Sequence, residues 1–125
     1  MHETIKEGSA IIRVKKAEKI SKEMEVFYNP VMKLNRDIAI LLLQQLPPMH
    51  LCDPLAASGV RSIRFAKELE YMSITANDSS RKAFSLIKSN MNQNKVKFNV
   101  SNGDANLFLL TSKGFAYIDI DPFGS

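Results

Sequence analysis

The chain has 125 residues, of which 45% are apolar and 24% are charged. These are ordinary values for a globular protein, so a disordered tail and a fibre are excluded, and the length allows one domain with a hydrophobic core but hardly two. The 17 basic and 13 acidic residues give a net charge of +4, which suits a polyanionic partner without requiring one.

Residues 1–29 are predicted to form a small β extension at the amino terminus. Between Ile5 and Val14, apolar residues are mixed with charged ones around Gly8, a pattern that fits an edge strand or a hairpin better than a helix. The main domain is then expected to cover residues 30–125.

A helix is predicted to begin at Pro30, because proline lacks only a backbone N–H that the first turn of a helix does not need. Apolar residues follow at helical spacing as far as Leu46. The pair Pro47-Pro48 then ends the helix, since proline cannot continue the hydrogen-bond pattern.

Short apolar runs that end in a polar residue, usually an aspartate, predict strands in the rest of the chain. The runs are 49–52, 72–76, 96–100 and 115–120. Helical periodicity separates the first three runs, and this alternation is typical of crossover units around a buried parallel sheet. We therefore expect a Rossmann-like α/β domain. Since Ser125 follows the last run so closely, the sheet is expected to be truncated after its fourth strand.

The apolar and cysteine content predicts the cellular compartment of the protein. The longest purely apolar run, 38–43, is far shorter than the roughly 18 residues of a membrane-spanning helix, so we expect no membrane association. Cys52 has no partner for an internal disulfide, and with only His2 and His50 beside it no zinc-ligand spacing can be built. We expect a reducing, cytoplasmic compartment, no metal ion and no obligate protein partner.

Ligands of open α/β sheets bind beyond the carboxyl ends of the strands, where this sequence places four acidic sites. The first is the loop from Asp53 to Gly59, whose small residues let the backbone approach a ligand. The loop holds a single glycine, which favours an adenosyl ligand without phosphates over a dinucleotide. An ordinary turn between strand and helix would explain the same residues.

The second and third sites follow the next two predicted strands. Asp78 can accept hydrogen bonds from both ribose hydroxyls of a nucleoside, or it can cap the helix that follows it. Asp104 and Ala105 offer a carboxylate and a backbone amide to an adenine edge, and an isolated turn is the alternative.

The fourth site is Asp121-Pro122-Phe123, after the last predicted strand. An exocyclic amino group of a nucleobase is a poor nucleophile because its lone pair is delocalised into the ring. A carboxylate and a carbonyl that accept its two N–H bonds favour the geometry in which that lone pair points at an electrophile. Phe123 is suited to stacking on a flipped base. Asp119, two positions earlier on the same strand face, is the next candidate, and a simple turn is the alternative.

Five motifs occur in order along nearly the whole chain. They are Phe-Tyr-Asn-Pro at 27–30, Asn-Arg-Asp at 35–37, the stretch 53–66, Asp-Ala-Asn at 104–106 and Asp-Pro-Phe-Gly-Ser at 121–125. In order and spacing they resemble the amino-terminal part of the tRNA (guanine-26-N2)-dimethyltransferase family of the archaeal type. The resemblance implies the class I methyltransferase fold with a mostly parallel sheet, S-adenosyl-L-methionine as methyl donor and tRNA as partner.

The resemblance also implies which residues bind the donor. Arg36 and Arg61 would contact it at its carboxylate, whereas without the resemblance both would be taken for solvated charges on helices. Asp78 would bind the ribose, and Asp104 and Ala105 would meet the adenine. The loop that contains Asp53 and Gly59 would lie against the same ligand.

For the substrate, the resemblance implies methyl transfer to the exocyclic N2 of a guanine in tRNA, at position 26 and twice in succession. Asp121 would be catalytic, with Pro122 and Phe123 completing its motif. Phe27 and Tyr28 would form a wall against the base, or equally would be core aromatics. An adenine-N6 nucleic-acid methyltransferase and a non-catalytic adenosyl- or RNA-binding fragment remain alternatives.

Overall fold

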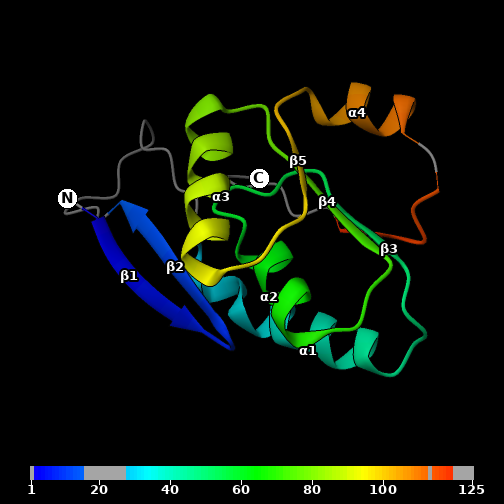
Figure 1. The fold of residues 1–125 in the computed structure, drawn as a ribbon, viewed down its shortest axis with the longest axis horizontal. Coiled ribbons are helices and arrows are strands. Elements are labelled where there is room, and N and C mark those ends of the chain that lie inside the picture. The colour runs from blue at the N-terminus through cyan, green and yellow to red at the C-terminus, as the bar shows by residue number, and fades with distance from the viewer. Residues whose placement is uncertain (1, 16–27, 113, 120–125) are drawn as a thin grey trace.

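The computed structural model describes residues 2–15, 28–112 and 114–119 (Figure 1). In chain order its elements are β1 (His2–Glu7), β2 (Ala10–Lys15), the 3-10 turn η1 (Pro30–Met32), α1 (Lys33–Gln44), β3 (His50–Asp53), α2 (Val60–Glu68), β4 (Ser73–Asn77), α3 (Arg81–Asn94), β5 (Asn99–Ser101), α4 (Ala105–Thr111) and β6 (Tyr117–Ile118). In the view of Figure 1, β3 and β4 run between α4 and the pair α1 and α2.

The amino-terminal hairpin is formed by β1 and β2, which pair antiparallel. Gly8 makes the turn with a φ of 54°, a left-handed conformation that glycine adopts at little cost. The predicted hairpin is therefore confirmed.

Four parallel strands in the order β5-β4-β3-β6 form the main sheet. Leu51 of β3 pairs with Ile74 of β4 on one side and with Tyr117 of β6 on the other. The chain adds β4 and β5 on one side of β3 and then β6 on the opposite side, so the order of the strands reverses between β3 and β6. A crevice for ligands is expected at such a switch point.

The helices begin where the sequence supplies a cap or a proline. The predicted start at Pro30 is a short 3-10 turn, capped by the Asn29 side chain, which accepts a hydrogen bond from the backbone of Val31. It leads directly into α1, and Ser80 caps α3 in the same way. Sequence periodicity did not predict α4, which begins at Ala105 after the capping residue Asp104.

Two strands are shorter than their apolar runs predicted. The third run begins at Val96, but the backbone N–H of that residue bonds to the Met91 carbonyl and closes the end of α3. This leaves only Asn99–Ser101 for β5. Within the described part of the fourth run, only Tyr117–Ile118 forms strand.

Three clusters of apolar side chains form the core. One joins the hairpin to α2 and consists of Ala10, Ile12, Val14, Val60 and Ile63. Another joins the sheet to α1 and α2 and consists of Ile40, Leu43, Leu51, Phe65 and Ile74. The last, against α3, consists of Ala56, Ala76 and Ile87. The hairpin thus shares its core with the main domain, and a division between residues 29 and 30 stays a prediction.

Buried asparagines fasten the hairpin to α3. The Asn94 side chain accepts a hydrogen bond from the backbone N–H of Ile11 at 2.8 Å and donates one to the Ile11 carbonyl at 2.7 Å. Asn90 makes the equivalent pair with Arg13 at 2.8 and 3.2 Å. The two amides therefore satisfy the free edge of β2, which would otherwise expose unpaired backbone groups. No helix in the described ranges is long and apolar enough to cross a membrane.

Candidate functional site

The loop that follows β3 is tightly constrained. Gly59 precedes α2 with a φ of 83°, and a Cβ atom there would lie 3.2 Å from Cγ2 of Ile87. Ala57 also has a positive φ, 53°, which costs a residue with a side chain on the order of 1 kcal/mol. Its backbone N–H donates to Oδ2 of Asp78 at 2.9 Å, so the strained loop is held by the neighbouring strand.

Asp53 ends β3 beneath this loop and is buried. Its Oδ2 accepts a hydrogen bond from the hydroxyl of Ser62 in α2 at 2.8 Å. The carboxylate therefore helps to fix the start of α2 against the sheet. Its contribution to donor binding stays a prediction.

Asp78 directly follows β4, and each of its carboxylate oxygens accepts a hydrogen bond from one backbone N–H. Oδ2 accepts from Ala57 and Oδ1 accepts from Ser80, both at 2.9 Å. The predicted alternative, in which Asp78 caps the next helix, is wrong, because the cap of α3 is Ser80. Each oxygen keeps a lone pair, so this half-buried carboxylate can still accept a hydrogen bond from a ribose hydroxyl.

The predicted adenine contact lies at the start of α4. Asp104 is exposed and caps that helix, since its Oδ1 accepts a hydrogen bond from the backbone N–H of Leu107 at 2.9 Å. Ala105 is the first residue of the helix. The adenine contact stays a prediction for both residues.

Arg36 is buried and is not the solvated helix charge that its sequence context allowed. Its Nε and Nη2 donate to the two carboxylate oxygens of Glu7 at 2.9 and 2.6 Å, and Nη2 also donates to the Asn29 carbonyl at 2.9 Å. The guanidinium carbon lies 5.1 Å from the ring centroid of Tyr28. These bonds to the described residues leave only Nη1 of Arg36 for the predicted contact with the carboxylate of the donor.

Sequence reasoning missed Glu7, which is fully buried at the end of β1. Besides Arg36 it accepts hydrogen bonds from the Tyr28 hydroxyl at 2.8 Å and from Nη1 of Arg64 at 3.1 Å. Burial alone would raise the pKa of Glu7, but the hydrogen bonds from Arg36, Tyr28 and Arg64 bring it below its ordinary value. Tyr28 is thus bound in a charged cluster, and its predicted contact with a base is untested. Phe27 lies outside the described residues.

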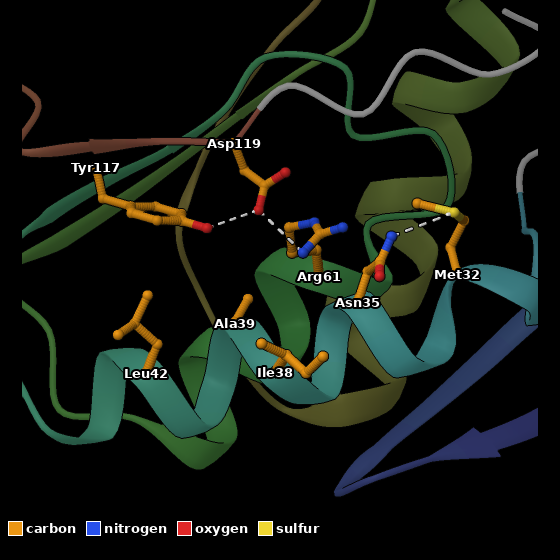
Figure 2. A pocket seen from close by; sticks show the side chains of 8 residues that line it. All are labelled: Met32, Asn35, Ile38, Ala39, Leu42, Arg61, Tyr117 and Asp119. Carbon is orange, nitrogen blue, oxygen red and sulfur yellow. Dashed lines mark hydrogen bonds and ion pairs between the residues drawn. The ribbon is translucent and has the colours of Figure 1, made fainter.

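Arg61 and Asp119 meet at the switch point between β3 and β6. Nη1 of Arg61, in α2, lies 2.9 Å from Oδ2 of Asp119 (Figure 2). The same oxygen accepts a hydrogen bond from the Tyr117 hydroxyl at 2.9 Å. Burial and the charge of Asp119 raise the pKa of Tyr117 to about 12, so this phenol remains a donor at neutral pH.

A cavity of about 310 Å³ opens beside this ion pair, between α1 and the end of β6. Its lining residues are Met32, Asn35, Ile38, Ala39, Leu42, Arg61, Tyr117 and Asp119. Figure 2 shows the charged groups on one wall and the aliphatic side chains of α1 on the other. The predicted catalytic residues Asp121, Pro122 and Phe123 lie outside the described residues, directly after the strand that places Asp119 here.

Comparison with known proteins identifies the family. The family model for N2,N2-dimethylguanosine tRNA methyltransferase matches residues 8–125. The chain belongs to this family. A tRNA (guanine(26)-N(2)/guanine(27)-N(2))-dimethyltransferase of Aquifex aeolicus is 41% identical over 98% of this chain and 34% of its own length. A tRNA (guanine(26)-N(2))-dimethyltransferase of Thermococcus kodakarensis is 38% identical over 97% of this chain and 36% of its own length.

A solved structure supports the fold of this dimethyltransferase family member. The complex of Trm1 from Pyrococcus horikoshii with S-adenosyl-L-methionine superposes with a TM-score of 0.84 at 36% identity, over 98% of this chain and 36% of that one. The predicted class I methyltransferase fold is therefore confirmed. The chain spans about a third of the length of these relatives.

Proposed function

We propose that this chain forms the donor-binding part of an enzyme that transfers methyl groups from S-adenosyl-L-methionine to the exocyclic N2 of a guanine in tRNA, at position 26 and twice in succession. The observation that carries the proposal is the likeness to Trm1, whose solved complex contains this donor, at 36% identity over 98% of the chain. The proposal extends to the residues of this chain that form its predicted motifs.

The charges at the carboxyl edge of the sheet fit an adenosyl donor. The loops 53–59, 77–80 and 101–105 together contain three aspartates and no lysine or arginine. Such a set repels a pyrophosphate, whereas ribose hydroxyls and an adenine amino group can donate to it. The tight loop at Gly59 and Ala57 offers backbone close to that edge. A nicotinamide dinucleotide is accordingly a poor fit.

Each donor-binding residue has one task in this proposal. Asp78 accepts hydrogen bonds from the ribose, and Asp104 and Ala105 receive the adenine at the start of α4. Arg36 and Arg61 supply positive charge for the carboxylate of the donor. Once bound, the donor supplies an electrophilic methyl group on a sulfonium.

The remaining task is to hold the guanine amine in line with that methyl group. Asp121 accepts its N–H bonds and so turns the nitrogen lone pair toward the electrophile, and Pro122 shapes the turn. Phe123 stacks on the base, with Phe27 and Tyr28 as the opposing wall. Positioning two reactants in this way is worth roughly 7–11 kcal/mol of activation free energy, and the displacement needs no metal ion.

The proposed partner is tRNA and the proposed compartment is the cytoplasm. A net charge of +4 favours association with a polyanion. The single cysteine is buried as a free thiol, which suits a reducing environment.

Two measurements test the proposal. In calorimetry on the chain, we expect S-adenosylhomocysteine to bind and NADH not to bind. Binding of NADH without binding of S-adenosylhomocysteine would refute the donor assignment. In the second measurement, an active enzyme that contains this chain is incubated with methyl-labelled donor and a tRNA transcript, and the label is located after nuclease digestion. We expect it on guanosine N2, and label on adenosine N6 would refute the substrate assignment.

A further inference from the structure

The Asn77 side chain uses its whole hydrogen-bonding capacity inside the protein. Its Nδ2 donates to the carbonyls of Pro54 and Gly103, both at 3.0 Å. Its Oδ1 accepts from the Ser101 hydroxyl at 2.7 Å and from the Gly103 backbone N–H at 3.1 Å. An amide has two donors and two acceptor lone pairs, so Asn77 is saturated, and it is 0% exposed. It therefore has nothing left with which to contact a ligand.

These four bonds join the loops that follow three neighbouring strands. Asn77 ends β4, Pro54 belongs to the loop after β3, and Ser101 and Gly103 lie at the end of β5 and beyond it. The backbone reinforces the same junction, because the Ala56 N–H donates to the Asn77 carbonyl at 2.9 Å. All the acidic residues proposed for donor binding lie on these three segments.

The turn after β5 is also bonded to the end of β4, because the Asn102 side chain donates to the Asp78 carbonyl at 2.8 Å, but this bond does not reach the loop after β3. Gly103 does not have the positive φ that only glycine tolerates easily, and a Cβ atom there would meet Oδ1 of Asn77 at an ordinary 3.7 Å. The position of the turn therefore does not depend on a backbone conformation that only glycine adopts easily. The side-chain amide of Asn77 bonds to both the turn after β5 and the loop after β3, and it therefore sets the distance between them.

We propose that Asn77 is a positioning residue of the adenosyl site, because its amide joins the turn that carries the adenine-binding residues to the loop after β3. The inference rests on the proposed function, which places the adenosyl group at this edge. An aspartate at position 77 would keep an acceptor oxygen, but it would replace two donated bonds by repulsion from the carbonyls of Pro54 and Gly103, and this repulsion would also weaken the contact with the Gly103 N–H. The segments would then move apart while the sheet beneath them stayed paired.

Asn94 provides a matched control at the far end of α3. Its amide is also buried, its Nδ2 also donates to two backbone carbonyls, those of Ile11 and Asn90, and its Oδ1 accepts from the Ile11 N–H. Asn94→Asp thus makes the same chemical change as Asn77→Asp. It disturbs the packing of the hairpin against α3, however, and not the loops at the carboxyl edge of the sheet. Any loss of affinity that follows from lower stability alone should appear in both variants.

The experiment compares the two variants in the full chain, below the melting temperature of each. Calorimetry gives the Kd for S-adenosylhomocysteine, and hydrogen exchange follows the backbone amides of Ala57 and Gly103 without ligand. Asn77→Asp should weaken binding roughly 10- to 100-fold and speed exchange at both amides, as expected for displaced binding groups, while Asn94→Asp stays within about twofold. If Asn77→Asp does not fold, Asn77→Ser, which removes the amide without introducing a charge, should show the same changes to a smaller degree.

The outcomes separate the inference from the proposed function. Equal losses of affinity in the variants at positions 77 and 94, or unchanged exchange at Ala57 and Gly103, would overturn the positioning role while the unaltered chain still binds. Failure of the unaltered chain to bind S-adenosylhomocysteine would overturn the proposed function, and the inference with it.

Discussion

Replacing Glu7 by glutamine should destabilise the protein more than any exposed substitution on the hairpin. The side chain is 1% exposed and accepts hydrogen bonds from two guanidinium groups and a phenol. Glutamine keeps the shape but removes the charge, and its NH₂ group then faces donors. Leaving a buried charge without its partner costs about 3–5 kcal/mol.

Most of that cost should come from Arg36. Arg64 retains ion pairs with Asp37 at 2.6 Å and with Glu68 at 2.7 Å when Glu7 is neutral. Among the described residues, Arg36 retains the carbonyl of Asn29 and the ring of Tyr28 but no carboxylate. The double variant Glu7→Gln, Arg36→Met should therefore recover part of the loss, because it removes the uncompensated charge as well.

Urea unfolding measures this effect. At an m-value of about 2 kcal/mol/M, a loss of about 4 kcal/mol lowers the midpoint by about 2 M, whereas Glu3→Gln, at an exposed residue of the same strand, should leave it nearly unchanged. Since the folded pKa of Glu7 lies below its ordinary value of 4.5, its contribution is present above that value and is lost as the pH falls through the folded pKa. A midpoint shift in Glu7→Gln no larger than in Glu3→Gln would refute this reasoning.

Three further substitutions test the site and the core. Asp78→Ala should weaken donor binding by about 1–3 kcal/mol through the loss of a half-buried acceptor, and unchanged affinity in calorimetry would leave Asp78 only its role of holding the loop. Leu43→Ala, at a side chain 6% exposed, should cost about 2–5 kcal/mol in urea unfolding, while Leu41→Lys, at one 61% exposed, should change stability by no more than about 0.5 kcal/mol. In an active enzyme that contains this chain, Asp121→Asn should lower kcat on the order of 10² to 10³ with donor affinity nearly unchanged, as single-turnover methylation of tRNA would show; a rate equal to the unaltered enzyme would transfer the catalytic role to Asp119.

Local sequence patterns predicted most of the secondary structure because each element has its own signal. The strands are apolar runs that end in polar residues, and the longer helices have apolar residues at helical spacing. The helix α4 was missed because apolar residues fill 107–110 without that spacing. Asp104 directly before an apolar stretch is a helix-start signal that could have found it, but the same aspartate was interpreted only as a ligand contact or a turn.

The polar interactions that fix the site could not be predicted in this way, because their partners are distant in sequence. Glu7 and Arg36 are 29 residues apart, and Asn94 and Ile11 are 83 apart. Asparagine in a helix normally indicates a solvated face, yet Asn90 and Asn94 are buried against a strand edge. Only the packing of the hairpin onto α3 reveals what these side chains bind.

The ion pair between Arg61 and Asp119 links the two halves of the proposed mechanism. Arg61 lies in the first turn of α2, directly after the loop at Gly59, and Asp119 lies two residues before Asp121. A guanidinium has five N–H donors in a rigid fork, so one arginine can serve more than one acceptor group. A lysine would offer one compact ammonium group and could not span two carboxylates with the same geometry. An arginine at this position therefore suits the alignment of the proposed donor-binding loop with the strand that precedes the proposed catalytic residue Asp121.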